Sequence, residues 1–340
     1  MTINNPPVYN DIPVVALAGG VGGAKLVDGL AQVVASENLT VIVNTGDDFE
    51  HLGLFICPDL DTVCYTLAGL ANPATGWGLA GETWHALETM AALGGPAWFR
   101  LGDRDLGLHL ERTRRKRMGQ PLSQITAHFC RTMGIRVRVI PMSDDAVPTW
   151  VYTSEGELPF QEYFVRRQCR PQVTGFRFDG VERAHPVEGA LEAIQAARLV
   201  VICPSNPWVS VDPILAVPGI RQAIQSKCAV AVSPIIGGQA VKGPAAKMYA
   251  ELGIQPSALA VARHYAGWLA GFILDRQDAG QASTIETLAI ESHLPASSEE
   301  SVRFSSDVSL RTLVTDTLMQ NAQDRARLAK EVVDFGLSLS

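Results

Sequence analysis

Residues 14–26 read VVALAGGVGGAKL, an apolar run followed by four glycines and a lysine. The continuous hydrophobic run before Gly19 predicts a strand that is buried on both faces of a parallel sheet. Because Gly19, Gly20, Gly22 and Gly23 have no Cβ atom, the backbone can turn sharply there and approach a ligand closely. A helix predicted to start near Gly22 would direct its unpaired N–H groups at the same place. The stretch therefore predicts a phosphate or diphosphate site after the first strand.

The glycine motif alone does not identify the ligand. It matches neither the GxGxxG pattern of dinucleotide-binding folds nor the GxxxxGK[ST] pattern of P-loops. An alternative is a glycine-rich turn that only lets the helix pack closely on its strand, and Lys25 would either neutralise a phosphate or be a solvated helix residue. An NAD(P)-dependent oxidoreductase is disfavoured, because no GxGxxG occurs and no single acid about twenty residues later is an obvious ribose ligand.

Buried-strand and helix patterns alternate along most of the remaining chain. The predicted strands are 14–17, 39–43, 136–140, 199–203, 228–232, 258–262 and 271–274, and the predicted helices are 22–35, 58–70, 82–93, 121–133, 312–319 and 323–335. This alternation is typical of βαβ units, which require a parallel sheet.

One segment differs from this pattern. Residues 149–180 carry aromatic side chains with period two, which predicts antiparallel strands with one solvated face. The predicted fold class is α/β: a Rossmann-like, mostly parallel sheet with helices on both faces and a small inserted antiparallel sheet. The predicted organisation is a disordered lead-in over 1–12, the first part of the core over 13–145, the insert over 146–185, and the second part of the core with C-terminal helices over 186–340.

Composition restricts the class of protein. With 340 residues, of which 47% are hydrophobic, the chain can bury a large core. A net charge of −7 argues against a nucleic-acid surface, and the densest basic run, 112–117, is expected to be a solvated helix face or the rim of a site for an anionic ligand. The N-terminal residues resemble no signal peptide and no stretch of about 18 apolar residues occurs, so we expect a cytoplasmic protein without membrane contact. Six cysteines without a CxxC pair and seven histidines without HxH or HExxH spacing predict reduced thiols and no zinc site.

Four aspartates follow the glycine motif in two short blocks. Asp47 and Asp48 end the block NTGDD after the second predicted strand, and Asp59 and Asp61 lie in PDLDT at the start of a predicted helix. In open α/β sheets the carboxyl ends of the strands face the ligand crevice, and carboxylate oxygens suit Mg²⁺. Plain capping of the helix N-terminus is the alternative for Asp59 and Asp61, and it explains one of them more easily than both. We therefore expect all four aspartates to be candidate metal ligands.

Three later loops carry further polar candidates. Asp103 and Arg104 belong to LGDRD, a pattern that taken alone is typical of a turn with a local ion pair. Ser205 and Asn206 belong to PSNP after a predicted strand, and Gly237 belongs to SPIIGG after the next. The last two loops are expected at the same edge of the sheet as the glycine motif.

Taken together, the motifs resemble those of a known family. In order along the chain they are AGGVGGAKL from Ala18, NTGDD from Asn44, PDLDT from Pro58, LGDRD from Leu101, PMSDD from Pro141, PSNP from Pro204 and SPIIGG from Ser233. This series resembles the 2-phospho-L-lactate transferase family of deazaflavin coenzyme (factor 420) biosynthesis, over nearly the whole chain.

The resemblance implies a reaction. A guanosine-diphosphate-linked donor would carry phospholactate, phosphoenolpyruvate or phosphoglycerate, the deazaflavin Fo would be the acceptor, GMP would be released, and Mg²⁺ would be required. It also implies a partner, the guanylyltransferase that makes the donor, and a homodimer. The sequence does not select the donor acid, because the three differ by one small group and a pocket resolves such a group by about 1–3 kcal/mol unless it binds the group by hydrogen bonds.

The resemblance also assigns residues. Asp61 and Arg100 would contact the deazaflavin, although the family often has lysine where Arg100 stands. For the reaction itself we expect Asp61 to orient or deprotonate the acceptor hydroxyl, with Asp59 as a second candidate catalytic residue. The remaining expected substrate contacts are Gly19, Gly20, Gly22, Gly23, Lys25, Asp103, Arg104, Ser205, Asn206 and Gly237. The alternative function is a non-catalytic, nucleotide-sugar-binding regulator with a related core, which PDLDT followed by LGDRD disfavours.

Overall fold

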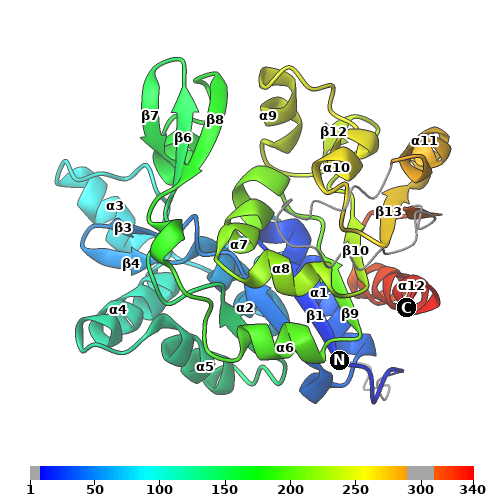
Figure 1. Cartoon of the computed structure of the whole chain (residues 1–340). Coiled ribbons are helices and arrows are strands. Elements are labelled where there is room, and N and C mark those ends of the chain that lie inside the picture. The colour runs from blue at the N-terminus through cyan, green and yellow to red at the C-terminus, as the bar shows by residue number, and fades with distance from the viewer. Residues whose placement is uncertain (1–7, 289–309) are drawn as a thin grey trace.

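The centre of the molecule is a seven-stranded sheet (Figure 1). The computed structural model describes residues 8–288 and 310–340. The strand order is β14-β13-β10-β9-β1-β2-β5, and every neighbouring pair is parallel. The strands are β1 (Val14–Ala18), β2 (Leu39–Val43), β5 (Arg138–Pro141), β9 (Leu199–Ile202), β10 (Ala229–Val232), β13 (Gly271–Asp275) and β14 (Arg311–Thr315). The predicted Rossmann-like α/β class is confirmed.

The strand order changes direction at β1. This strand pairs with β2 on one side and β9 on the other, so that Leu17 lies between Ile42 and Ile202. Connections leave β1 toward opposite edges of the sheet, and ligands of such sheets bind at this reversal, outside the carboxyl ends of the strands. The loops that follow β1, β2 and β9 meet there.

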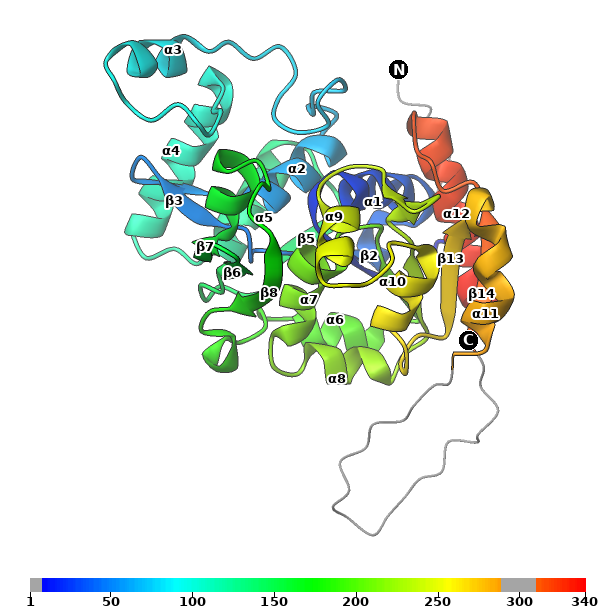
Figure 2. The same cartoon turned by 90° about the horizontal axis from the view of Figure 1, so that it is seen from above.

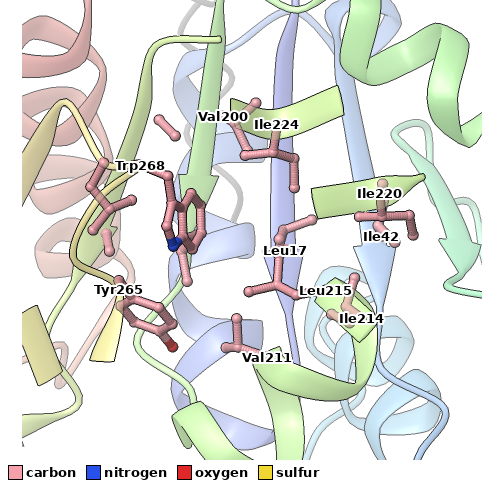
Figure 3. Close-up of a cluster of buried hydrophobic side chains, with 14 of the residues drawn as sticks. Leu17, Ile42, Val200, Val211, Ile214, Leu215, Ile220, Ile224, Tyr265 and Trp268 are labelled. Carbon is pink, nitrogen blue, oxygen red and sulfur yellow. The ribbon is translucent and has the colours of Figure 1, made fainter. Parts of the chain in front are cut away.

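Alternate side chains of the strands pack against two helical layers, as the period of two in a strand requires. Figure 3 shows Leu17, Ile42 and Val200 on one face of the sheet, against apolar side chains of the covering helices that include Ile220 and Ile224. This layer contains α6 (Ala190–Ala196), α7 (Asp212–Ala216), α8 (Ile220–Gln225) and α10 (Ala258–His264). The other face packs against α1 (Gly20–Val33), α2 (Pro58–Leu67) and α12 (Ala322–Ser338). Coverage of both faces explains why the strands are continuously apolar.

Smaller elements surround this core. The remaining helices are α3 (His85–Ala92), α4 (Asp103–Arg117), α5 (Leu122–Thr132), α9 (Ala245–Glu251) and α11 (Ala282–Glu286). Two-stranded sheets are formed by β3 (Phe49–His51) with β4 (Leu54–Ile56), and by β11 (Ile235–Ile236) with β12 (Gln239–Ala240). The expected antiparallel insert is a sheet of order β7-β6-β8, made of β6 (Thr149–Thr153), β7 (Gly156–Pro159) and β8 (Val173–Phe178). Figure 2 shows α3 and α4 at one end of the molecule and α12 at the other.

Two predicted elements have the wrong type. Residues 258–262, predicted as a strand, form α10, where the side chain of Ser257 caps the helix by accepting a hydrogen bond from Ala260 N. Residues 312–319, predicted as a helix, contain β14, whose residues Thr312 and Leu313 pair with β13. In both cases a short apolar run fits either period, and the cap or the neighbouring strand decides the outcome.

Two further predictions need smaller corrections, one within the insert and one at the N-terminus. Glu162–Arg166, expected to continue the strand pattern, is a short π-helical turn. Residues 1–7 of the predicted lead-in lie outside the described residues, but Tyr9 is buried and its backbone bonds to Val33 and Ala35. The sequence prediction of a lead-in up to residue 12 is therefore wrong for the part around Tyr9. Within the described chain, no helix has the length and apolarity that a membrane span needs.

Candidate functional site

Four aspartates gather at the reversal point of the sheet. Asp47 and Asp48 lie in the loop after β2, and Asp59 and Asp61 lie in the first turn of α2, where Pro58 occupies a first-turn position that needs no N–H donor. Asp47, Asp59 and Asp61 are buried, and Asp48 is partly buried with an Oδ1 atom that is inaccessible and has no hydrogen-bond partner. We call these four residues the acidic cluster.

The side chain of Asn44 joins the acidic cluster to the glycine turn. Asn44 Nδ2 donates to Asp59 Oδ2 at 2.9 Å and to the carbonyl oxygen of Val209 at 3.2 Å, while its Oδ1 accepts from Gly46 N at 2.8 Å. Asp59 in turn lies against the turn, because a Cβ placed on Gly19 would be 2.6 Å from Asp59 Oδ2. The amide of Asn44 thus holds one carboxylate at the N-terminus of α1.

The environment of the cluster makes its carboxylates hard to ionise. Burial raises the pKa of Asp59 to about 6, although hydrogen bonds from Asn44 and the Gly20 backbone oppose the shift. Burial, with the neighbouring carboxylates of Asp59 and Asp48, raises the pKa of Asp47 well above its ordinary value. A buried group of acids in this state is stabilised by protons or by a cation.

An arginine from the basic run neutralises part of this charge. Arg112 is buried on α4, and its guanidinium donates to both carboxylate oxygens of Asp61. The expectation that 112–117 is a solvated face or a ligand rim is therefore wrong for Arg112. The other members differ: Arg114 and Arg115 bond to Glu111, Lys116 lies over the Phe55 ring, and Arg117 donates to the Gly53 carbonyl.

An open pocket of about 470 Å³ lies beside the acidic cluster. Its walls include Asp47 and Asp48 on one side and five aromatic side chains: Phe49, Phe55, Trp98, Trp150 and Phe160. The side chain of Gln161 also lines it and donates to the carbonyl oxygen of Asp47 at 3.2 Å. Aromatic walls next to carboxylates suit a planar ligand that carries hydroxyl groups.

Two glycines of the turn, Gly20 and Gly22, have different functions. Gly20 has φ +60°, a conformation that favours glycine, whereas a Cβ on Gly22 would collide with the carbonyl oxygen of Pro204. The loop after β9 is also bonded to the turn through Ser205, whose Oγ donates to Gly19 O at 2.7 Å and accepts from Gly19 N at 3.1 Å. Close packing, the alternative reading of the motif, therefore accounts for Gly22, while Gly20 shapes the turn at the start of α1.

This difference predicts different phenotypes. Gly20→Val should fold and weaken binding of GDP more than binding of Fo, because its side chain would occupy the space at the N-terminus of α1. Gly22→Val should instead lower the melting temperature or prevent folding, since the clash is with backbone. Calorimetric titration with each ligand and thermal unfolding measure the two effects.

Gly134→Val is the matched control for strain at Gly20. Gly134 has φ +73° and nothing within 4 Å of its Cβ position, so the substitution adds similar backbone strain without placing a side chain at the N-terminus of α1. It should leave GDP affinity unchanged. If Gly20→Val weakened Fo binding and not GDP binding, the N-terminus of α1 would contact Fo rather than the nucleotide.

Some expected substrate contacts have protein partners in the structure. Lys25 Nζ donates to the Met319 carbonyl at 2.8 Å, and burial, with Arg325 and Lys242 nearby, lowers the pKa of Lys25. Asn206 Oδ1 accepts a hydrogen bond from Trp208 N at 3.0 Å, and Gly237 N donates one to Asp278 Oδ2 at 3.0 Å. A role of these residues in binding substrate stays a prediction.

The residues expected from the LGDRD region lie near α3 and α4. Arg100 is exposed with its guanidinium carbon 4.3 Å from the centre of the Trp84 ring. Asp103 accepts hydrogen bonds from Thr83, His85 and Ala86, and Arg104 donates to the Ala80 carbonyl. The structure brings none of the three to the acidic cluster. The member of LGDRD that approaches it is Asp105, which lies 3.3 Å from His109.

Sequence reasoning missed Asn44, Asp105, His109 and Arg112 as site residues. Asn44 stood in a motif that was recognised, and its position at the end of β2 could have identified it. The pair of Asp61 and Arg112 is separated by 51 residues, and no local pattern connects residues at that separation.

Several known proteins are similar in sequence to this chain. Residues 14–315 match the family described as 2-phospho-L-lactate transferase CofD. A phosphoenolpyruvate transferase of Streptomyces griseus subsp. griseus is 46% identical over 285 residues, which cover 82% of this chain and 90% of that protein. A phosphoenolpyruvate transferase of Streptomyces coelicolor is 45% identical over 285 residues, with 82% and 89% coverage.

The fold has a solved counterpart. The crystal structure of a UPF0052 family member from Bacillus halodurans superposes with a TM-score of 0.57 and 16% identity, covering 97% of this chain and 100% of that one. At this identity the likeness shows the fold alone. The family match over most of the chain, with relatives of more than 40% identity, shows more: this chain belongs to the 2-phospho-L-lactate transferase family.

Proposed function

We propose that this member of the family transfers the phosphoenolpyruvate moiety from a guanosine-diphosphate-linked donor to the deazaflavin Fo and releases GMP. The observation that carries the proposal is the acidic cluster, in which Asp59 lies against the glycines at the N-terminus of α1 while Asp47 and Asp48 line the aromatic pocket. A diphosphate and a planar acceptor could therefore reach the same carboxylates. Phosphoenolpyruvate is favoured over phospholactate and phosphoglycerate because the relatives at 46% and 45% identity carry that name.

The acidic cluster fits a magnesium ion shared with the substrate. Asp48 Oδ1 is buried without a partner, and the pKa of Asp47 is raised by burial and by its neighbours, so both have oxygens that a cation would satisfy. In residues 8–288 and 310–340, no three side chains of His, Cys, Asp or Glu are arranged to hold an ion by themselves. One or two of Asp47, Asp48 and Asp59 would hold Mg²⁺ together with the diphosphate. The bound ion would neutralise charge on the phosphate oxygens.

The chain supplies positioning for both substrates. N–H groups at the start of α1 would bind the donor diphosphate, and the aromatic pocket would hold the ring system of Fo with its ribityl chain toward the acidic cluster. The terminal hydroxyl oxygen of Fo attacks the phosphorus nearest the organic acid, and the bond from that phosphorus to the oxygen of GMP breaks. Asp61 orients the hydroxyl or accepts its proton. Positioning of this kind is the main contribution of proteins to phosphoryl transfer.

The proposal is tested by product masses. The purified protein is incubated with Fo, Mg²⁺ and each of the three guanylylated donors in turn. The products are separated by chromatography and their molecular masses are measured by mass spectrometry. The phosphoenolpyruvate product should form fastest. Faster reaction with another donor would overturn the choice of donor, and no product with any of them would overturn the proposed reaction.

The raised pKa of Asp59 predicts a pH dependence of the reaction. Ionised Asp59 is the form that can bind a cation, so kcat/KM should fall as the pH decreases through about 6. Asp59→Asn should remove this acid limb together with most of the activity. A rate that stays constant through this range would contradict the assignment.

The free energy of unfolding of the ligand-free protein should depend on pH in the opposite sense to kcat/KM. Folded Asp59 keeps its proton up to about pH 6, whereas in the unfolded chain it loses the proton near the ordinary value of 3.8. The folded state therefore binds more protons between these values, and the contribution of Asp59 to the free energy of unfolding decreases as the pH rises through them. Asp59→Asn should flatten this slope in denaturant titrations of the ligand-free protein at about pH 4 and about pH 6.

A cytoplasmic location, a homodimer and a guanylyltransferase partner stay predictions.

A further inference from the structure

The buried arginine of α4 fixes one carboxylate of the acidic cluster. Arg112 is 3% exposed, and its NH1 donates to Asp61 Oδ2 at 3.0 Å while NH2 donates to Asp61 Oδ1. The Phe129 ring centre lies 5.8 Å from the guanidinium carbon. A guanidinium that binds both oxygens fixes the plane of a carboxylate, which a contact through a single atom does not. The orientation of Asp61 thus depends on α4 as well as on α2.

Arg112 is itself held by a chain of polar side chains that returns to α2. His109 Nδ1 lies 3.1 Å from Arg112 NH1, and His109 Nε2 lies 3.3 Å from Asp105 Oδ1. Asp105 also accepts a hydrogen bond from Tyr65, which follows Asp61 by one helical turn on α2. The contacts form a closed ring through the two helices, in which the approach of His109 to Asp105 is a close contact without hydrogen-bond geometry.

The charges of the ring explain why it contains an arginine. Among the residues that the structure describes, Arg112 is the one buried arginine or lysine, and it faces the acidic cluster. Its cation lies beside Asp61 and acts on Asp48 as well, where it opposes the increase in pKa that burial causes. Removal of the guanidinium would leave Asp61 buried without a counter-charge.

We propose that Arg112 is a positioning residue of the transfer reaction: it clamps Asp61 in the orientation in which this carboxylate meets the acceptor hydroxyl. The inference rests on the proposed role of Asp61 in transfer. Because both oxygens of Asp61 are bound by Arg112, Asp61 is available to the hydroxyl through its remaining lone pairs and is a poor ligand for a metal. Asp47, Asp48 and Asp59 are then left to hold the cation.

The test is Arg112→Lys, which keeps the charge and loses the two-point contact. We expect kcat to fall about ten- to hundredfold, the scale of a misplaced catalytic group, while the KM for the guanylylated donor stays near the wild-type value. The melting temperature is measured in parallel, and kcat is expressed per folded molecule. Wild-type kcat in folded Arg112→Lys would overturn the proposal.

A double-mutant cycle separates positioning from mere structural support. If Arg112 acts through Asp61, Arg112→Lys should lower kcat in the wild-type background and have little further effect in Asp61→Asn. An equal factor in both backgrounds would overturn the clamp. Full activity of Asp61→Asn would remove the premise about Asp61, and this outcome is distinguishable because it does not involve Arg112.

Two further variants keep the experiment decisive. His109→Gln retains an acceptor for Arg112 NH1 and tests the same ring if Arg112→Lys fails to fold. We expect it to lower kcat less than Arg112→Lys does, and this loss should also vanish in the Asp61→Asn background. Arg325→Lys is the matched control, since Arg325 NH1 bonds to Asp28 Oδ2 at 3.1 Å between α12 and α1. It should leave kcat unchanged, and an equal loss in this control would overturn the specific role of Arg112.

Discussion

Asp61→Asn is expected to fold and to lose the transfer rate by about a hundredfold or more, the scale of a group that transfers or orients a proton. The carboxylate lies in the first turn of α2, two residues after Asp59, and Arg112 binds both of its oxygens. Asparagine keeps the shape but presents an NH₂ group to one side of the guanidinium, so that both the charge and the orientation change. The measurement is single-turnover transfer to Fo with saturating donor.

The control for this substitution is Asp179→Asn. Asp179 is exposed and bonds to Arg177 at the end of the inserted sheet, so the same chemical change there should leave the rate unchanged. Circular dichroism and thermal unfolding establish that both variants are folded. Near-normal turnover of folded Asp61→Asn would remove Asp61 from the mechanism and leave Asp59 as the remaining acid of PDLDT.

The core of the fold was predictable because its strands are covered on both faces. Continuous apolar runs such as Leu39–Val43 have no solvated side, as strands covered on both faces require. The run 258–262 is as long and as apolar but forms α10, because Ser257 caps a helix there. The other run that failed lies at the margin of the sheet. Arg311–Thr315 is the edge strand β14, and its pattern is set by pairing with β13 rather than by burial on both faces.

The positions of the four aspartates followed from local signals in the sequence. Asp47 and Asp48 were expected at the ligand edge because they follow a predicted strand, and they lie in the loop after β2. Asp59 and Asp61 were expected at the start of a helix, and they lie in the first turn of α2. By contrast, Asp103 and Arg104 were chosen from a charged motif, yet their side chains bond to the segment before α3. Arg112 could not be selected from its neighbours in the basic run, because its burial depends on how α4 packs against α2 and α5.

Removal of divalent cations is expected to abolish transfer, although the ligand-free protein should bind Mg²⁺ only weakly, with a dissociation constant on the order of millimolar or higher. Mg²⁺ gives up water reluctantly and is usually held by one or two carboxylates together with substrate phosphates. The arrangement of this site agrees with that expectation: Arg112 occupies both oxygens of Asp61, and Asn44 already donates to Asp59. A diphosphate at the N-terminus of α1 would supply the missing oxygens, so GDP and Mg²⁺ should strengthen the binding of each other, as linkage requires.

Calorimetric titration of Mg²⁺ with and without GDP measures this coupling. Asp47→Asn should weaken the binding of Mg²⁺ in the presence of GDP, and Asp179→Asn should not, because Asp179 is remote from the cluster and pairs with Arg177. Equal and tight binding with and without GDP would mean that the protein holds the ion by itself, against the geometry of the four aspartates. Full activity in excess EDTA would exclude a metal-assisted reaction, and the acidic cluster would then have to act through protons, with an acid limb in the rate that follows Asp59 alone.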